Sequence, residues 1–180
     1  MRYLEAPTQF SGRERTLFLA GGISGCRDWQ RELVARLAET DLVILNPRRA
    51  NFPMGDPAAG REQIEWEFRH QRRATMAAFW FPPETLCPIT LYELGAWSML
   101  LDKPLFVGTD PAYARRFDVE VQLALARPEV RVVGSLAELA GQVAAAAARP
   151  FPSRSPFVHP IPPGTKGDGV AEDSSSNYAD

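Results

Sequence analysis

The sequence predicts an α/β domain built on a doubly wound, five-stranded parallel sheet. Short apolar runs typical of buried strands alternate with longer segments whose apolar residues recur at helical spacing. Parallel strands need such crossovers, whereas antiparallel strands can be joined by tight turns. The chain has 180 residues, of which 45% are hydrophobic, enough for one domain with its own core.

Turn signals follow the first three predicted strands. They are Gly21-Gly22, Asn46-Pro47 and Pro82-Pro83. The five strands are expected at residues 16–20, 42–45, 77–81, 105–107 and 130–133. The five helices are expected at residues 27–39, 61–75, 88–102, 114–126 and 136–148. This pattern indicates a flavodoxin-like or Rossmann-like sheet with helices on both faces.

The ends of the chain differ from this pattern. Residues 1–15 are expected to form an N-terminal extension to a domain that covers residues 16–149. From Pro150 the sequence is dense in proline and then rich in Gly, Asp and Ser. Such a segment buries too little apolar area to offset the entropy lost on ordering. Residues 150–180 are therefore predicted to be a flexible tail.

Composition and cysteine usage exclude several classes of protein. The net charge of -2 gives no reason to expect a nucleic-acid partner. No apolar run approaches the ~18–20 residues of a membrane span, and the first residues lack a signal-peptide pattern. Two cysteines, Cys26 and Cys87, favour a reduced, cytoplasmic location. His70 and His159 lack metal-ligand spacing, so neither a metal nor another cofactor is expected.

The loop after the first strand is the first candidate binding element. In doubly wound sheets, ligands bind beyond the carboxyl ends of the strands. Gly21 and Gly22 would let the backbone approach a ligand, and Ser24 could donate to a phosphate or a sugar hydroxyl. The spacing is not that of a dinucleotide-binding loop, and a simple tight turn explains the glycines equally well.

The loop after the second strand is a candidate for binding an anion. Asn46 begins it, and the pair Arg48 and Arg49 could grip a phosphate or a carboxylate. A solvated basic loop is the alternative for either arginine taken singly.

Two glutamates in predicted helices are candidates for acid–base or nucleophilic chemistry. Glu67 follows Ile64 by three residues, so it lies near the rim of the sheet if Ile64 packs inward. Glu93 stands among apolar residues in the helix after the third strand, where an unpaired carboxylate is costly. Gly95 in the same helix suggests a close approach by another backbone or a ligand. Ordinary exposed glutamates are the alternative.

Four segments together resemble the nucleoside 2-deoxyribosyltransferase superfamily, in its bacterial deoxyribosyltransferase-like branch. They are FLAGGISG (residues 18–25), LNPRR (45–49), QIEWE (63–67) and FWFPPETLCPITLYELG (79–95). The last is the most specific, because the Glu-Leu-Gly at its end is where the family keeps its nucleophile. The resemblance therefore implies that Glu93 is the nucleophile and that Glu67 is the carboxylate that helps to orient sugar and base.

The same resemblance extends the predicted site. It implies that the Gly/Ser loop lies near the sugar and the 5′ end of the substrate. Glu84 and Thr90, which flank the start of the last helix of the motif, are also expected to contact substrate. Cys87 stands where better-known transferases carry a base-contacting Asp, and Thr75 where many members carry another Asp. The superfamily further implies a homo-oligomer, a dimer or larger.

The expected function is cleavage or transfer of an N-glycosidic bond of a nucleoside or nucleotide. A glutamate nucleophile would give a glycosyl ester that water or a second base resolves with net retention. Two alternatives remain open from the residues. One is a nucleotide-binding sensor or defence module of the same fold with little turnover. The other is a phosphate-binding protein of flavodoxin-like form with a different chemistry.

Overall fold

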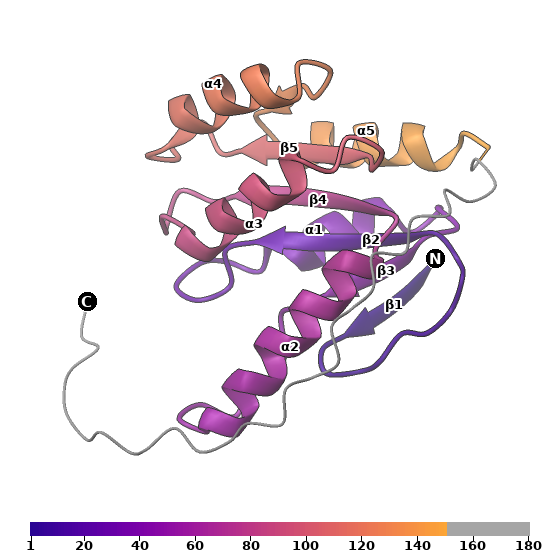
Figure 1. Cartoon of the computed structure of the whole chain (residues 1–180), viewed down its shortest axis with the longest axis vertical. Coiled ribbons are helices and arrows are strands. Elements are labelled where there is room, and N and C mark those ends of the chain that lie inside the picture. The colour runs from indigo at the N-terminus through magenta and orange to yellow at the C-terminus, as the bar shows by residue number, and fades with distance from the viewer. Residues whose placement is uncertain (151–180) are drawn as a thin grey trace.

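Over residues 1–150, which the computed structural model describes, six parallel strands form one sheet in the order β1-β3-β2-β4-β5-β6 (Figure 1). The strands are β1 (Arg2–Glu5), β2 (Thr16–Gly21), β3 (Val43–Asn46), β4 (Met76–Phe81), β5 (Leu105–Thr109) and β6 (Val132–Val133). The helices are α1 (Trp29–Arg36), α2 (Pro57–Arg73), α3 (Pro88–Ser98), α4 (Arg116–Ala126) and α5 (Leu136–Ala147). All of the predicted tail except Pro150 lies outside the described residues.

The predicted fold class is confirmed. Strands β2 to β6 are the five predicted strands, and all of their pairings are parallel. Strand β2 lies between β3 on one side and β4 on the other, so the order of the strands reverses at β2. This is the flavodoxin-like order, and the point of reversal is where such sheets bind ligands.

The sheet has one strand more than the sequence predicted. Residues 2–5, placed by prediction in an N-terminal extension, pair in parallel with β3 as edge strand β1. Strand β1 joins β2 through a loop rather than through a helix, so it does not repeat the strand–helix alternation. It is also only four residues long, and Leu4 is its one buried residue. A short edge strand of this kind carries too weak a pattern to be recognised.

The helices cover both faces of the sheet, as alternation of side chains along each strand requires. Helices α2, α3 and α4 pack on the face that carries Phe18 and Phe79. Helices α1 and α5 pack on the opposite face, which carries Leu17 and Leu19 (Figure 1). Any side chain near the sheet can therefore be assigned to the α2–α4 face or to the α1/α5 face.

The N-terminal segment is fastened to α2 by two aromatic side chains. Trp66 Nε1 donates to the Thr8 carbonyl over 2.8 Å, and the Phe10 amide donates to His70 Nε2 over 3.1 Å. The rings of Trp66 and His70 stack with their centroids 4.1 Å apart. Burial lowers the pKa of His70, which favours the neutral ring that can accept this bond. Residues 1–10 are thus built into the fold.

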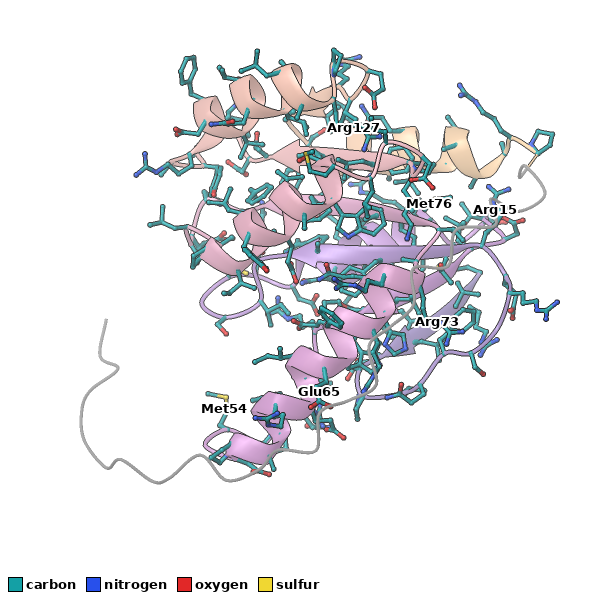
Figure 2. The ribbon with its side chains drawn as sticks, in the orientation of Figure 1. Arg15, Met54, Glu65, Arg73, Met76 and Arg127 are labelled. Atoms are coloured by element: carbon teal, nitrogen blue, oxygen red, sulfur yellow. The ribbon has the colours of Figure 1, made fainter. Side chains whose placement is uncertain are left out.

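The helix ends depart from prediction where capping residues intervene. Helix α2 begins at Pro57, four residues before the predicted start, because Asp56 caps it by accepting from the Ala58 amide at 2.9 Å. At the other edge of the molecule, Arg15 donates to the carbonyls of Ala146 and Arg149 at the end of α5 (Figure 2). None of the helices in residues 1–150 is both long and apolar enough to cross a membrane.

Candidate active site

The loops after β2 and β4 lie side by side where the strand order reverses. These strands are neighbours, with Gly21 in register with Trp80 near their carboxyl ends. Arg27, in the first loop, lies 3.9 Å from a carboxylate oxygen of Glu84 in the second. It also lies 3.6 Å from Asp110 after β5. One arginine therefore links three loops at the edge where a ligand is expected.

Glu67 and Glu93 come together from two different helices. Glu67 lies on α2 and Glu93 on α3, and both helices cover the same face of the sheet. Gln63 donates to Glu67 Oε1 over 2.8 Å, and Gln71 donates to Glu93 Oε1. Both glutamates are half-buried. Each carboxylate is thus held by a neutral amide rather than by a cation.

This environment favours the protonated form of both carboxyl groups. Burial raises the pKa of Glu67 above its ordinary value. Burial and, next, the nearby charge of Glu67 raise the pKa of Glu93 to about 7, although the hydrogen bond from Gln71 opposes this. Two coupled carboxyl groups with raised pKa values can divide the roles of nucleophile and proton carrier near neutral pH.

Cys87 has no properties of a nucleophile. It is buried directly before α3, and burial raises the pKa of its thiol to about 11, with Cys26 adding to the effect. Its backbone has φ of 50°, in the left-handed region.

Within the described residues, no group of three or more His, Cys, Asp or Glu side chains could hold a metal ion.

The glycines of the first loop have packing reasons for their presence. A Cβ at Gly21 would lie 2.4 Å from the Trp29 ring and from the Trp80 carbonyl oxygen. A Cβ at Gly22 would lie 2.9 Å from Pro82 and 3.0 Å from Cys87 in the loop after β4. Gly22 therefore lets the two loops meet, and Gly21 lets Trp29 of α1 pack against the ends of β2 and β4. Ser24 lies beyond them and is exposed.

Arg48 holds the first loop in place. Its guanidinium donates to the carbonyls of Cys26 and Arg27, each over 3.1 Å, and to Gln30 Oε1 over 3.2 Å. These bonds use much of its donor capacity. Arg49 turns away, 3.1 Å from Glu62. The arrangement favours a positioning role for Arg48 over direct contact with an anion.

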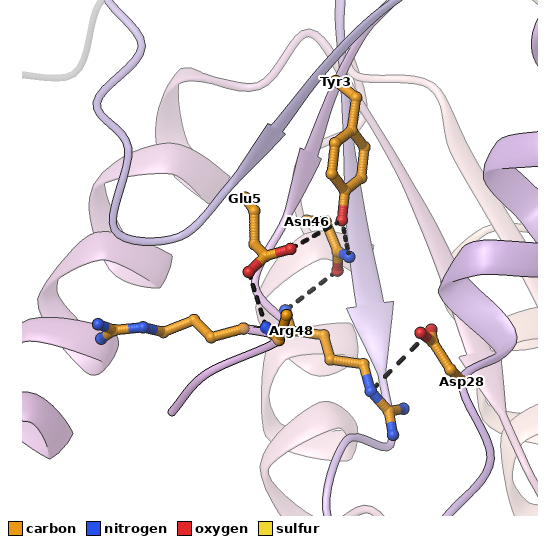
Figure 3. A pocket seen from close by; sticks show the side chains of 7 residues that line it. Tyr3, Glu5, Asp28, Asn46 and Arg48 are labelled. Atoms are coloured by element: carbon orange, nitrogen blue, oxygen red, sulfur yellow. Dashed lines mark hydrogen bonds and ion pairs between the residues drawn. The ribbon is translucent and has the colours of Figure 1, made fainter. Parts of the chain in front are cut away.

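A pocket of about 310 Å³ lies beside Arg48 (Figure 3). Its lining comprises Tyr3, Glu5, Asp28, Asn46, Arg48, Arg49 and Ala50. Asn46 is buried, and its amide donates to the Tyr3 hydroxyl over 2.8 Å. Tyr3 is in register with Ile44, whose side chain belongs to the α1/α5 face. The side chains of Tyr3 and Asn46 therefore lie on the opposite face of the sheet from Glu67 and Glu93.

Residues 14–113 match the model of a protein family described as nucleoside 2-deoxyribosyltransferase like. The chain belongs to this family. The match begins before β2 and ends after β5, so it includes both glutamates and all three loops that Arg27 links. Strands β1 and β6 and helices α4 and α5 lie outside it. No curated protein matches the chain.

Membership of the family confirms the predicted resemblance, and the structure shows how the motif residues are arranged. Glu67 and Glu93 are brought together, whereas Asn46 and Arg48 lie across the sheet. Thr90 is buried within α3. Thr75 exchanges hydrogen bonds of 2.8 and 2.9 Å with Thr16, at the amino end of the strands and away from the site. Thr75, the residue before β4, therefore ties this strand to the start of β2.

One interpretation from the sequence is wrong in its first alternative. Gly95 predicts a close approach by another backbone or by a ligand, but a Cβ built there meets no protein atom within 4 Å, so no neighbouring backbone requires the glycine. The residue lies on the exposed side of α3.

Sequence reasoning missed Gln63 and Gln71. Together with Glu67 they are spaced four residues apart along α2, which places all three on one helix face. That spacing is visible in the sequence, but glutamine titrates no proton, so the pattern does not by itself indicate acid–base chemistry. Tyr3 and Glu5 also line the pocket. The sequence did not indicate them because strand β1, which carries both, was not predicted.

Proposed function

We propose that this protein breaks the N-glycosidic bond of a nucleoside or nucleotide and passes the sugar to water or to a second base. The observation that carries this proposal is the pairing of Glu67 with Glu93. These two half-buried carboxyl groups come from separate helices and lie close enough to interact. Burial first, and then the charge of Glu67, raises the pKa of Glu93 to about 7. Family membership supports a nucleoside as the substrate class.

In the first step, Glu93 acts as the nucleophile. One oxygen of its carboxylate attacks C1′ of the sugar while the C1′–N bond breaks and its electron pair leaves with the base. A glycosyl ester forms on Glu93. The leaving base takes up a proton. In the reactive form the coupled pair holds one proton, which we assign to Glu67 when Glu93 is ionised, so Glu67 supplies it.

In the second step, the ester is resolved by an acceptor. Water or the nitrogen of an incoming base attacks C1′ from the side that the first base left, and the Glu93 carboxylate departs. Glu67, now ionised, takes the proton that the acceptor loses. Two inversions at C1′ give net retention of configuration.

The loop after β2 is the proposed contact for the sugar and its 5′ end. Ser24 is exposed at the tip of this loop, next to Gly25, whose φ of 71° is one that glycine adopts readily. Arg48 stabilises the loop through its hydrogen bonds to the Cys26 and Arg27 carbonyls. We assign Arg48 an indirect role in binding the 5′ end, and Ser24 a direct one.

Chromatographic analysis of products, after incubation with a panel of nucleosides and their 5′-monophosphates, tests the function. Release of free base, or its exchange for an added base, is the expected result. Glu93→Gln should lower turnover by ~10³-fold or more, as when one member of a catalytic unit is removed. The matched control is Glu65→Gln, because Glu65 lies on α2 but is exposed and 3.5 Å from Arg69.

Two outcomes would count against the proposal. Near-normal turnover by Glu93→Gln on a confirmed substrate would show that another group is the nucleophile. Saturable binding of a nucleotide without release of base, across the whole panel, would favour the sensor or defence module of the same fold.

A further inference from the structure

Gln63, Glu67 and Gln71 form a polar row on α2, each four residues from the next. Gln63 Nε2 donates both to Glu67 Oε1 and to the Pro47 carbonyl, over 2.8 and 2.6 Å. Gln71 Nε2 donates to Glu93 Oε1 on the neighbouring helix α3. The row therefore fixes one oxygen of each carboxyl group from the same side.

We propose that Gln71 is a positioning residue for the nucleophile: its amide fixes Glu93 Oε1 and leaves Oε2 to attack C1′. This inference rests on the proposed function, and it adds the reason that Glu93 holds one orientation. A free carboxylate side chain would rotate among several rotamers, and only some of them direct an oxygen at the sugar. One hydrogen bond to Oε1 removes much of that freedom.

A glutamine suits this task better than a charged donor would. An arginine or lysine at this position would hold the carboxylate strongly and reduce its readiness to form an ester. The amide stabilises the ionised form only in part, because burial and Glu67 still dominate the titration of Glu93. It also has no proton to exchange, so Glu67 remains the proton carrier of the pair.

The two glutamines are not equivalent. Gln63 is tied to the backbone at Pro47, which directly follows β3, so it also connects α2 to the loop that carries Arg48. The bond from Gln71, in contrast, goes to the proposed nucleophile itself. Loss of Gln71 should therefore affect the chemical step more than it affects binding of substrate.

The test compares Gln71→Leu with the wild type by steady-state kinetics and by carbon NMR of glutamate labelled at Cδ. The resonance of Glu93 is assigned by its absence in Glu93→Gln. We expect kcat to fall by ~10- to 100-fold, the scale for loss of a hydrogen bond to a charged group, with KM nearly unchanged. The rising limb of the pH profile and the NMR titration of Glu93 should both move to higher pH.

The control is Gln142→Leu, the same chemical change on α5, where Gln142 donates to the Arg131 carbonyl over 3.1 Å. It should leave kcat, the pH profile and the titration of Glu93 as in the wild type. A kcat in Gln71→Leu equal to that of the wild type would overturn the inference, as would an unmoved titration of Glu93.

The inference and the proposed function can fail separately. If the wild type turns over no substrate of the panel, the proposed function fails and with it the role of Gln71 in a chemical step. If the wild type is active but Gln71→Leu is indistinguishable from it, only the inference fails. A fall in kcat that the Gln142→Leu control shares would also overturn it, because the effect would then not be specific to the site.

Discussion

Replacing Glu93 with glutamine should make the folded protein more stable than the wild type above neutral pH, and equally stable in mild acid. The pKa of Glu93 rises from 4.5 to about 7 in the folded protein because the group is buried and lies near Glu67. Gln71 can donate to the amide oxygen of a glutamine as it does to the carboxylate. The substitution therefore removes the charge and keeps the shape and the hydrogen bond.

The sign and the size follow from the difference in proton binding. Between pH 4.5 and about 7 the folded protein holds the Glu93 proton while the unfolded chain has lost it, so stability falls as pH rises through this window. With ~1.4 kcal/mol for each pH unit between the two pKa values, the full loss is about 3 kcal/mol. Glu93 is half-buried, so we expect Glu93→Gln to gain about 2 kcal/mol at about pH 8 and almost nothing near pH 4.5.

Urea unfolding followed by tryptophan fluorescence at several pH values measures this gain. Trp29, Trp66, Trp80 and Trp97 are all buried and report on the core. Glu39→Gln, at an exposed residue just after α1, is the control and should show no comparable gain. A stability difference for Glu93→Gln that does not change with pH would refute the idea that burial and Glu67 destabilise the ionised form of Glu93. A loss of stability at high pH would refute it as well.

Three further predictions follow from the contacts. Glu67→Gln removes the like charge beside Glu93, so the rising limb of kcat/KM against pH should move to lower pH; an unmoved limb would mean that the two groups do not interact. Arg48→Ala should expose the loop after β2 to limited proteolysis, whereas Arg49→Ala, which loses a bond to Glu62, should not. Deletion of residues 1–10 should lower the urea midpoint strongly, since loss of one buried Phe alone typically costs ~3–5 kcal/mol; a midpoint like that of the wild type would contradict the place of β1 in the sheet.

The sequence predicted the sheet well because its inner strands are buried on both faces. β4 is apolar at every position from Met76 to Phe81, and such runs with turn signals after them are readily recognised. β1 has only Leu4 buried and connects to β2 without a helix, so its existence depends on pairing with β3 and on the anchors at Thr8 and Phe10. Contacts between distant segments do not appear as local periodicity.

The candidate site was predictable only in part, for a similar reason. Glu93 and Glu67 stand in motifs, but their interaction depends on how α2 packs beside α3. The sequence makes the pair Arg48 and Arg49 a candidate for binding an anion because of its charge. The hydrogen bonds of Arg48 to two carbonyls of the first loop and to Gln30 of α1 are tertiary and leave no local pattern. Gln71 contributes a bond across helices that no spacing along one helix reveals.

The most direct test of the central claim, that Glu93 is the nucleophile, is mass spectrometry of the enzyme quenched with acid during turnover. The peptide containing Glu93 should carry the mass of the sugar, and Glu93→Gln should carry no such adduct. A sugar found on a different peptide, or no adduct at all while base is being released with retention of configuration, would contradict the claim.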